Sequence, residues 1–173
     1  FQVVDAADPT HLALEATVLT DASARGVVAD GDRLYLATDG GLQVFTCDVG
    51  VVTPRGFLVT PAFLRLAVSG GLAFLGLPSS GDLMVADVTD PDSPIEIERV
   101  ALPISGTPFL ALAATGRTAY VAHGAAGLIA VFADVSGDLR VIDTALSEFG
   151  SASFGAVAVV GNRLVAETPA TPA

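Results

Sequence analysis

The sequence lacks several residue types on which common functional sites depend. It has one cysteine, Cys47, and no lysine or tryptophan, so its eight basic residues are all arginines. A single cysteine excludes an intrachain disulfide and a paired-thiol redox or zinc motif. The glycine pairs at 40–41 and 70–71 do not form a phosphate-binding loop, because such a loop needs a lysine and a following helix. We therefore expect no cofactor, and we interpret the glycines as turn residues.

Positive charge is scarce as well. Nineteen acidic residues give a net charge of −11 and an isoelectric point near 4.2. Phosphate backbones and anionic lipid surfaces would be repelled by such a chain. The longest uncharged run, 100–116, has 17 residues and contains two prolines, whereas a membrane span needs about 18 or more apolar residues. The composition thus predicts no nucleic acid partner and no membrane insertion.

A unit built around a glycine recurs along the chain. Gly31, Gly70, Gly116 and Gly161 are 39, 46 and 45 residues apart, and an apolar run precedes each of them. Four places after the glycine the residue is aromatic in three copies and valine in the fourth. Glycine supplies the positive φ that a tight two-strand turn needs. Each unit therefore predicts a β-hairpin.

Two further strands follow each hairpin. The third is apolar and ends in aspartate, and the fourth alternates apolar and polar residues. Copies of the third strand are 41–48, 83–87, 127–134 and a shortened 1–5; copies of the fourth are 12–19, 95–102, 139–146 and a weak 57–59. Four short strands in about 40 to 45 residues are typical of a β-propeller blade. Segment 11–24 has helix-favouring residues, but the repeat register predicts a strand.

The units predict an all-β propeller domain over 1–167, with four-stranded antiparallel blades. Blade units are expected at 24–60, 61–103 and 108–147, with a fourth blade shared between 154–167 and 1–20. Pairing of these terminal strands would close a four-bladed ring and remove exposed sheet edges. A β-sandwich and a slice of a larger propeller are the alternatives. We interpret 168–173, rich in Pro, Ala and Thr, as a tail, and the start at Phe1 as a processed or excised end.

One copy of the third strand ends in Asp-Val-Thr-Asp-Pro at 87–91, and Gly-Leu opens this strand after Tyr35 and after Tyr120. This pattern resembles the LVIVD-repeat propellers of bacterial and archaeal cell-surface proteins. Segments 1–9 and 134–138 match more loosely, and 47–50 departs from the Asp-Pro ending. The resemblance spans nearly the whole chain and implies an extracellular or cell-surface domain that serves as a platform. It implies no shared catalytic motif.

Propellers usually bind ligands on the face that collects the loops entering the inner strand and those joining the second strand to the third. On this chain the predicted face carries Arg25, Asp39, Arg65, Asp82, His123 and Glu148, with Phe63, Phe109 and Phe149 nearby. We expect a non-catalytic domain that binds a protein or glycan there, and we expect at least two of the phenylalanines to pack under the blades. The alternatives are a hydrolase or lyase with Arg65, His123 and Asp39 at the axis, and a structural segment of a larger chain.

Other chemistry-bearing residues are predicted to be structural. Asp87, Asp90 and Asp92 form a weak calcium candidate, because calcium takes several oxygen ligands, but aspartates before proline are also ordinary turn residues. His123 and His11 are expected to be polar turn residues. Cys47 is expected to be a small buried side chain.

Overall fold

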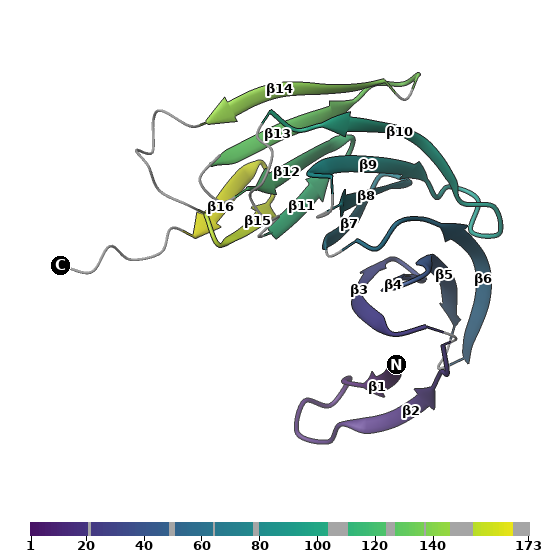
Figure 1. Ribbon diagram of the computed structural model, residues 1–173. Coiled ribbons are helices and arrows are strands. Elements are labelled where there is room, and N and C mark those ends of the chain that lie inside the picture. The colour runs from purple at the N-terminus through teal and green to yellow at the C-terminus, as the bar shows by residue number, and fades with distance from the viewer. Residues whose placement is uncertain are drawn as a thin grey trace.

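The computed structural model describes residues 1–20, 22–48, 51–63, 65–77, 80–103, 111–123, 127–136, 138–145 and 154–167. These residues form sixteen β-strands and no helix, and so none provides a helix able to span a membrane. Three four-stranded antiparallel sheets and two hairpins account for all the strands (Figure 1). The predicted all-β class with four-stranded blades is therefore confirmed.

Each full sheet is built from four consecutive strands. Blade 1 consists of β3 (Ala24–Asp30), β4 (Arg33–Thr38), β5 (Gly41–Asp48) and β6 (Val51–Val59). Blade 2 consists of β7 (Arg65–Ser69), β8 (Leu72–Leu77), β9 (Asp82–Asp87) and β10 (Ile95–Ala101). Blade 3 consists of β11 (Ala111–Thr115), β12 (Thr118–Ala122), β13 (Leu128–Ala133) and β14 (Leu139–Ala145). The N-terminal hairpin is β1 (Gln2–Asp5) with β2 (Ala13–Thr17), and the C-terminal hairpin is β15 (Ala156–Val160) with β16 (Arg163–Glu167).

The repeated glycines make the turns between the first and second strands. Gly31, Gly70, Gly116 and Gly161 have φ values of 63°, 61°, 54° and 60°, a region that other residues rarely adopt. A Cβ added at Gly70 would lie 3.0 Å from the carbonyl oxygen of Gly116. The turns of blades 2 and 3 thus approach each other closely.

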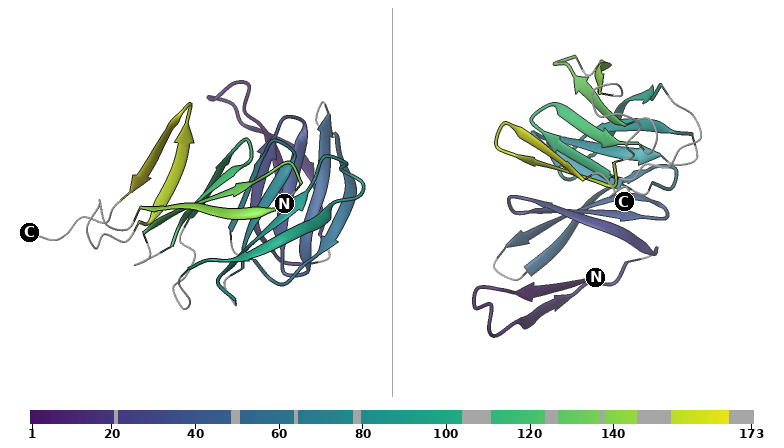
Figure 2. Two further views of the ribbon diagram at one scale, coloured as in Figure 1. Left: turned by 90° about the horizontal axis from the view of Figure 1, so that it is seen from above. Right: turned by 90° about the vertical axis from the view of Figure 1, so that its left-hand side faces the viewer.

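Blade 2 is covered on both faces, which explains its uninterrupted apolar strands. Leu72 and Phe74 of β8 belong to one core cluster with blade 3, whereas Ala73 and Leu75 belong to another with blade 1. All six residues of β8 are buried. A two-layer sandwich covers each sheet on one face only, so this packing agrees with a propeller. Figure 2 shows the sheets side by side as successive wedges.

The first strand of each blade is the inner one. Strand β3 contacts β7, β7 contacts β11, and β11 contacts β15. The alanines of β11 and β15 suit this crowded position, because small side chains let strands approach one another. Among the described residues, β3, β7, β11 and β15 therefore line the inside of the arc that the blades form (Figure 1).

Polar contacts add to the junction between blades 1 and 2. Arg33 donates to the carbonyl oxygens of Val88 and Thr89, at 2.8 and 3.0 Å. The backbone N–H of Gly56 donates to the carbonyl oxygen of Pro91 at 2.7 Å. The loop after the third strand is therefore a docking element for the neighbouring blade.

The aspartate that ends the third strand organises this loop. Asp87 Oδ1 accepts from the backbone N–H and the hydroxyl of Thr89, at 2.8 and 2.6 Å. Asp134 makes the same two bonds with Ser136, and these bonds lower the pKa of Asp134. The repeated aspartate is thus a turn-forming residue in both blades.

Two features of the strands differ from expectation. The fourth strand of blade 1 is not limited to 57–59, because β6 runs from Val51 and includes Pro54. Proline is compatible with this place because β6 is the outer edge of its sheet, where one N–H has no neighbouring strand. The predicted pairing of the terminal strands is also not seen: the N-terminal and C-terminal hairpins form separate two-stranded sheets, at opposite ends of the arc (Figure 1).

Candidate functional site

Sequence-predicted site residues gather at one end of the blades. Arg65 begins an inner strand, and Arg25 is the second residue of another. Asp82 begins a third strand, and His123 directly follows a second strand. Asp39 lies in the turn between β4 and β5. Because neighbouring strands are antiparallel, the start of the first strand, the end of the second and the start of the third share one end of each sheet. We call this end the strand-start face.

Arg25 and Asp39 form an ion pair on this face. The Arg25 Nε donates to Asp39 Oδ1 at 2.6 Å, and the two side chains are 51% and 40% exposed. The hydrogen bond and the charge of Asp39 raise the pKa of Arg25. Asp39 is further fixed by its backbone N–H, which donates to the carbonyl oxygen of Ser23 at 3.1 Å. The pair leaves charged atoms of both signs accessible to a partner.

Blade 2 adds further charges to the strand-start face. Arg65 is exposed and lies opposite Gly76, while Asp82 lies opposite Leu77 and Ala101. On the adjacent outer strand, Arg99 donates to both carboxylate oxygens of Glu96, at 2.5 and 2.7 Å, but Glu96 lies near the start of β10 and so towards the opposite end of the sheet. Glu96, and to a smaller extent Asp82, raise the pKa of Arg99. The face of blade 2 therefore also combines both signs of charge.

His123 was expected to be a polar turn residue on the predicted ligand face, but it is not accessible there. Its side chain is fully buried, and its backbone N–H donates to the carbonyl oxygen of Gly127 at 3.0 Å. Burial lowers the pKa of the imidazole, because the charged form loses solvation. The repeat pattern aligned His123 with an exposed turn in blade 1 and gave no sign that the side chain is buried in blade 3.

The aromatic residues contribute less to this face than the sequence suggested. Phe63 is fully buried and belongs to the core between blades 1 and 2, as expected for a side chain packed under the blades. Glu148, Phe109 and Phe149 lie outside the described residues. Among the described residues predicted for this face, the side chains open to a partner are therefore the charged ones.

The arrangement gives little support to an axial active site made of Arg65, His123 and Asp39. A general base must reach a proton of the substrate, but the His123 side chain is fully buried in this structure. Asp39 is bound by Arg25 instead of orienting an imidazole.

The carboxylates of the calcium candidate have other partners. Asp90 Oδ1 accepts from the backbone N–H of Asp92 at 3.0 Å, and Asp92 Oδ2 pairs with Arg55 Nη2 at 2.7 Å. Asp87 bonds to Thr89 as described above. Within the described ranges, no group of three or more metal-ligating side chains comes together. Turn formation explains these residues, and calcium binding stays a hypothesis for a melting experiment with and without chelator.

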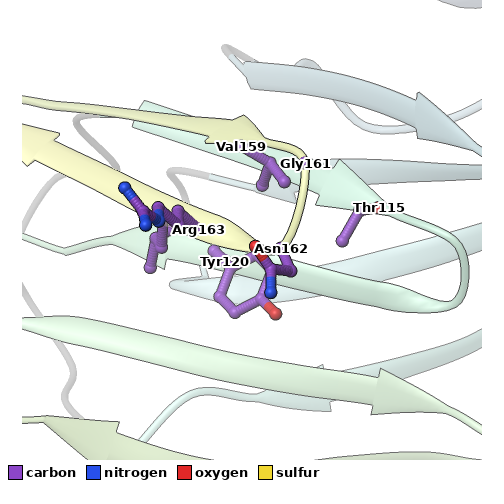
Figure 3. Close-up of a pocket in the computed structure, with 7 residues that line it drawn as sticks. Thr115, Tyr120, Val159, Gly161, Asn162 and Arg163 are labelled. Carbon is purple, nitrogen blue, oxygen red and sulfur yellow. The ribbon is translucent and has the colours of Figure 1, made fainter.

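The structure shows a pocket that the sequence did not indicate, at the opposite end from the strand-start face. It has a volume of about 270 Å³ and lies between the hairpin turns of blade 3 and the C-terminal hairpin (Figure 3). Its lining residues are Thr115, Tyr120, Val159, Gly161, Asn162, Arg163 and Leu164. The pocket exists because two separate hairpin turns meet, and a single repeat contains no signal for that.

A second, larger groove of about 400 Å³ lies between the N-terminal hairpin and blade 1. It is mostly apolar and is lined by Phe1, Gln2, Val3, Val4, Val27, Ala29, Leu34 and Cys47. Cys47 is half-buried there, not fully buried as expected. The ring of Phe1 packs edge-on against the ring of Phe45 in β5, with ring centroids 5.2 Å apart. This contact helps to hold the N-terminal hairpin against blade 1.

Solved structures of low sequence identity share this fold. A Lactobacillus plantarum protein, a structural genomics target, matches with a TM-score of 0.67 and 20% identity, over 83% of this chain and 50% of its own. BamB from Moraxella catarrhalis matches with a TM-score of 0.58 and 13% identity, over 82% and 39%. A structure of Saccharomyces cerevisiae Dbp5 bound to Nup159 and Gle1 matches with a TM-score of 0.50 and 14% identity, over 83% and 38%. The chain thus spans half or less of the length of these proteins.

Sequence comparison adds one specific match. Residues 64–101, which contain all four strands of blade 2, match the LVIVD repeat. No curated protein sequence matches the chain. The solved neighbours are propeller-type proteins. The chain therefore carries an LVIVD repeat within an all-β fold of the propeller type.

Proposed function

We propose that the chain is a non-catalytic domain that binds a protein partner through its strand-start face, as part of an exported or cell-surface protein. The observation that carries the proposal is the position of Arg25, Asp39, Arg65 and Asp82 at one end of two consecutive blades. Their strands belong to sheets whose cores are closely packed. Charges of both signs held on a rigid support favour specific recognition of a partner of complementary charge.

The propeller-type neighbours are compatible with this role. One of them occurs in a structure of Dbp5 bound to Nup159 and Gle1, which is an assembly of proteins. The resemblance to LVIVD-repeat proteins supports placement at the cell surface. Neither comparison names a partner for this chain, so binding must be tested on the domain itself.

A random-peptide display library and a glycan array are suitable probes. Peptides selected on the wild-type domain should bind at least about tenfold more weakly to Arg65→Glu and Asp39→Arg, because a like charge replaces an opposite one at the interface. Arg140→Glu is the matched control, since Arg140 is 67% exposed on the outer strand β14. The proposal fails if the selected peptides bind all three variants equally, or if only glycans are retained.

A second role, as one arc of a larger ring, is supported by a separate observation. The chain matches 50% of the Lactobacillus plantarum protein and 39% of BamB, which supports a role as one arc of a larger ring. The two roles are compatible, because the strand-start face belongs to blades within the arc.

A further inference from the structure

The two end hairpins are complementary halves of one blade. The C-terminal hairpin consists of two strands joined by a glycine turn, like the inner pair of every full blade. The N-terminal hairpin consists of a strand ending in Asp5 and its partner, as the outer pair does. Among the described residues, no third strand pairs with the outer side of β16, and no second strand pairs with the inner side of β1.

Each half also has one face that the arc leaves uncovered. On the C-terminal hairpin, Val160 is 64% and Val165 57% exposed, whereas Val159 and Leu164 face blade 3. On the N-terminal hairpin, Val4 is 46% and its cross-strand neighbour Leu14 60% exposed. Phe74 and Ala86, at the positions of blade 2 that match Val165 and Val4, are fully buried, so these exposed faces are those that a further blade would cover.

Strand β3 also has an uncovered side. The inner strands of neighbouring blades contact each other throughout the arc, yet Val27 of β3 is 58% exposed. Val27, Ala29 and Leu34 line the groove beside β1. This groove lies where the inner hairpin of a complete blade would pack.

We propose that a second copy of this chain completes the ring, with the C-terminal hairpin of each copy pairing edge to edge with the N-terminal hairpin of the other. Each junction then forms a four-stranded blade in the order β15, β16, partner β1, partner β2. Closure within one chain would join the same edges, but these lie at opposite ends of the arc (Figure 1). The chain covers only half of the Lactobacillus plantarum propeller, which supports a ring of two arcs. The inference is independent of the ligand proposed for the strand-start face.

Blade 2 predicts the register of this junction, because its outer pair has the same layout as the N-terminal hairpin. In both, the aspartate that ends the third strand lies opposite the first residue of the fourth strand, and a bulge follows after the next pair. In blade 2 the residue two places after the turn glycine, Leu72, lies opposite this aspartate, Asp87. The same register places Arg163 opposite the partner's Asp5, and Val165 opposite the partner's Val3, which lines the groove beside blade 1.

A backbone bond and a charge pair fit the same register. In blade 2 the N–H of Val88, the residue after the aspartate, donates to the carbonyl oxygen of Gly71, the residue after the turn glycine, at 2.9 Å. The corresponding bond at the junction joins the N–H of the partner's Ala6 to the carbonyl oxygen of Asn162. Arg163 and the partner's Asp5 then lie directly opposite each other, within reach of an ion pair.

Two such junctions close the assembly. The two copies are related by a half-turn, so the two junctions are equivalent, and the assembly closes as a ring instead of growing into a filament. Closure pairs the free edges of β1 and β16, which are otherwise open to aggregation. It also covers the apolar faces of both hairpins.

Light scattering coupled to size exclusion tests the stoichiometry. The wild-type chain should have twice the 17.4 kDa mass of one copy. Val165→Asp should halve the measured mass, because it puts a charge into the junction while the residue is exposed in the single chain. Val59→Asp, on a side chain 75% exposed at the end of β6, should leave the mass doubled. A wild-type mass of 17.4 kDa, or a doubled mass for Val165→Asp, overturns the proposal.

Engineered cysteines test the pairing itself. Val165 and the partner's Val3 form a non-hydrogen-bonded pair in the proposed register, which brings their Cβ atoms close enough for a disulfide. In a Cys47→Ser background, chains with Val165→Cys alone and chains with Val3→Cys alone should yield a covalent heterodimer when co-expressed and oxidised. If a chain that carries both substitutions instead forms the disulfide within itself, the ring closes with one copy and the proposal is wrong.

Discussion

Replacing Gly56 with alanine tests the packing between blades 1 and 2. Gly56 is buried in β6, where it faces the loop after the third strand of blade 2. A Cβ at this position would lie 2.3 Å from Cδ of Pro94 and 2.7 Å from the carbonyl oxygen of Pro91. Two of the three nearest atoms belong to the backbone, so rotation of a side chain cannot relieve the clash.

The expected loss of stability in Gly56→Ala follows from two effects. Inserting a methyl group into a well-packed junction costs about 1–3 kcal/mol through displaced backbone and side chains. Moving the loop away also lengthens the bond from the Gly56 N–H to Pro91, now 2.7 Å, and a buried hydrogen bond contributes about 1 kcal/mol. We expect Gly56→Ala to lower the free energy of unfolding by about 3 kcal/mol.

Urea unfolding followed by far-ultraviolet circular dichroism measures this loss. Gly26→Ala is the matched control, because Gly26 also lies in a blade 1 strand but has no atom within 4 Å of the added Cβ and no positive φ. It should be neutral or stabilising by up to about 1 kcal/mol, since alanine restricts the unfolded chain. If Gly56→Ala unfolds at the same urea concentration as Gly26→Ala, the blades are not packed as described.

Three further substitutions test the core, the repeated aspartate and the buried histidine. Phe74→Ala should lower the free energy of unfolding in urea by about 3–5 kcal/mol, because Phe74 is fully buried. Phe57→Ala, at a side chain 47% exposed, should lower it clearly less. Equal losses would contradict the placement of Phe74 in the core. Asp87→Ala should cost about 1–2 kcal/mol by removing two hydrogen bonds, whereas Asp87→Asn keeps an acceptor oxygen and should lose less; thermal melts that rank them in the opposite order would refute the turn role. Since burial lowers the pKa of His123, its contribution to stability is complete above the pKa of the unfolded state and declines as the pH falls through it towards the folded-state pKa. His123→Gln should therefore show a smaller loss of stability between pH 7 and pH 5 than the wild type, with His11→Gln, on an exposed side chain, as the control; parallel profiles would exclude this coupling.

Local features of the repeat were predictable from sequence. The positive φ of Gly31 and Gly116 follows from the chemistry of a two-residue turn. The strand at Ala13–Thr17 was predicted against its helix-favouring composition, because the repeat register carries more information than the propensity of five residues. These features depend on contacts within one unit, and one unit is visible in the sequence.

Features that depend on neighbouring blades were harder to predict. Proline normally excludes a strand interior, yet Pro54 lies in β6, since an outer edge does not need every N–H. The burial of His123 depends on what covers the loop, and an exposed turn at the aligned position in blade 1 gave no indication of it. The charged residues of the strand-start face could be predicted, because antiparallel topology alone places them at one end of the sheets. The pocket beside Tyr120 could not, because it depends on how two hairpin turns meet.

Every hydrogen-bonded ladder of a full blade joins consecutive strands, so each blade is a continuous stretch of chain with its own backbone bonding. Duplication or loss of a whole unit would leave the ladders of the remaining blades intact and would change only the contacts between neighbouring blades. The number of units can then change during evolution in single steps of one blade. Selection on such a domain acts mainly at the two places where a new unit must fit its neighbours.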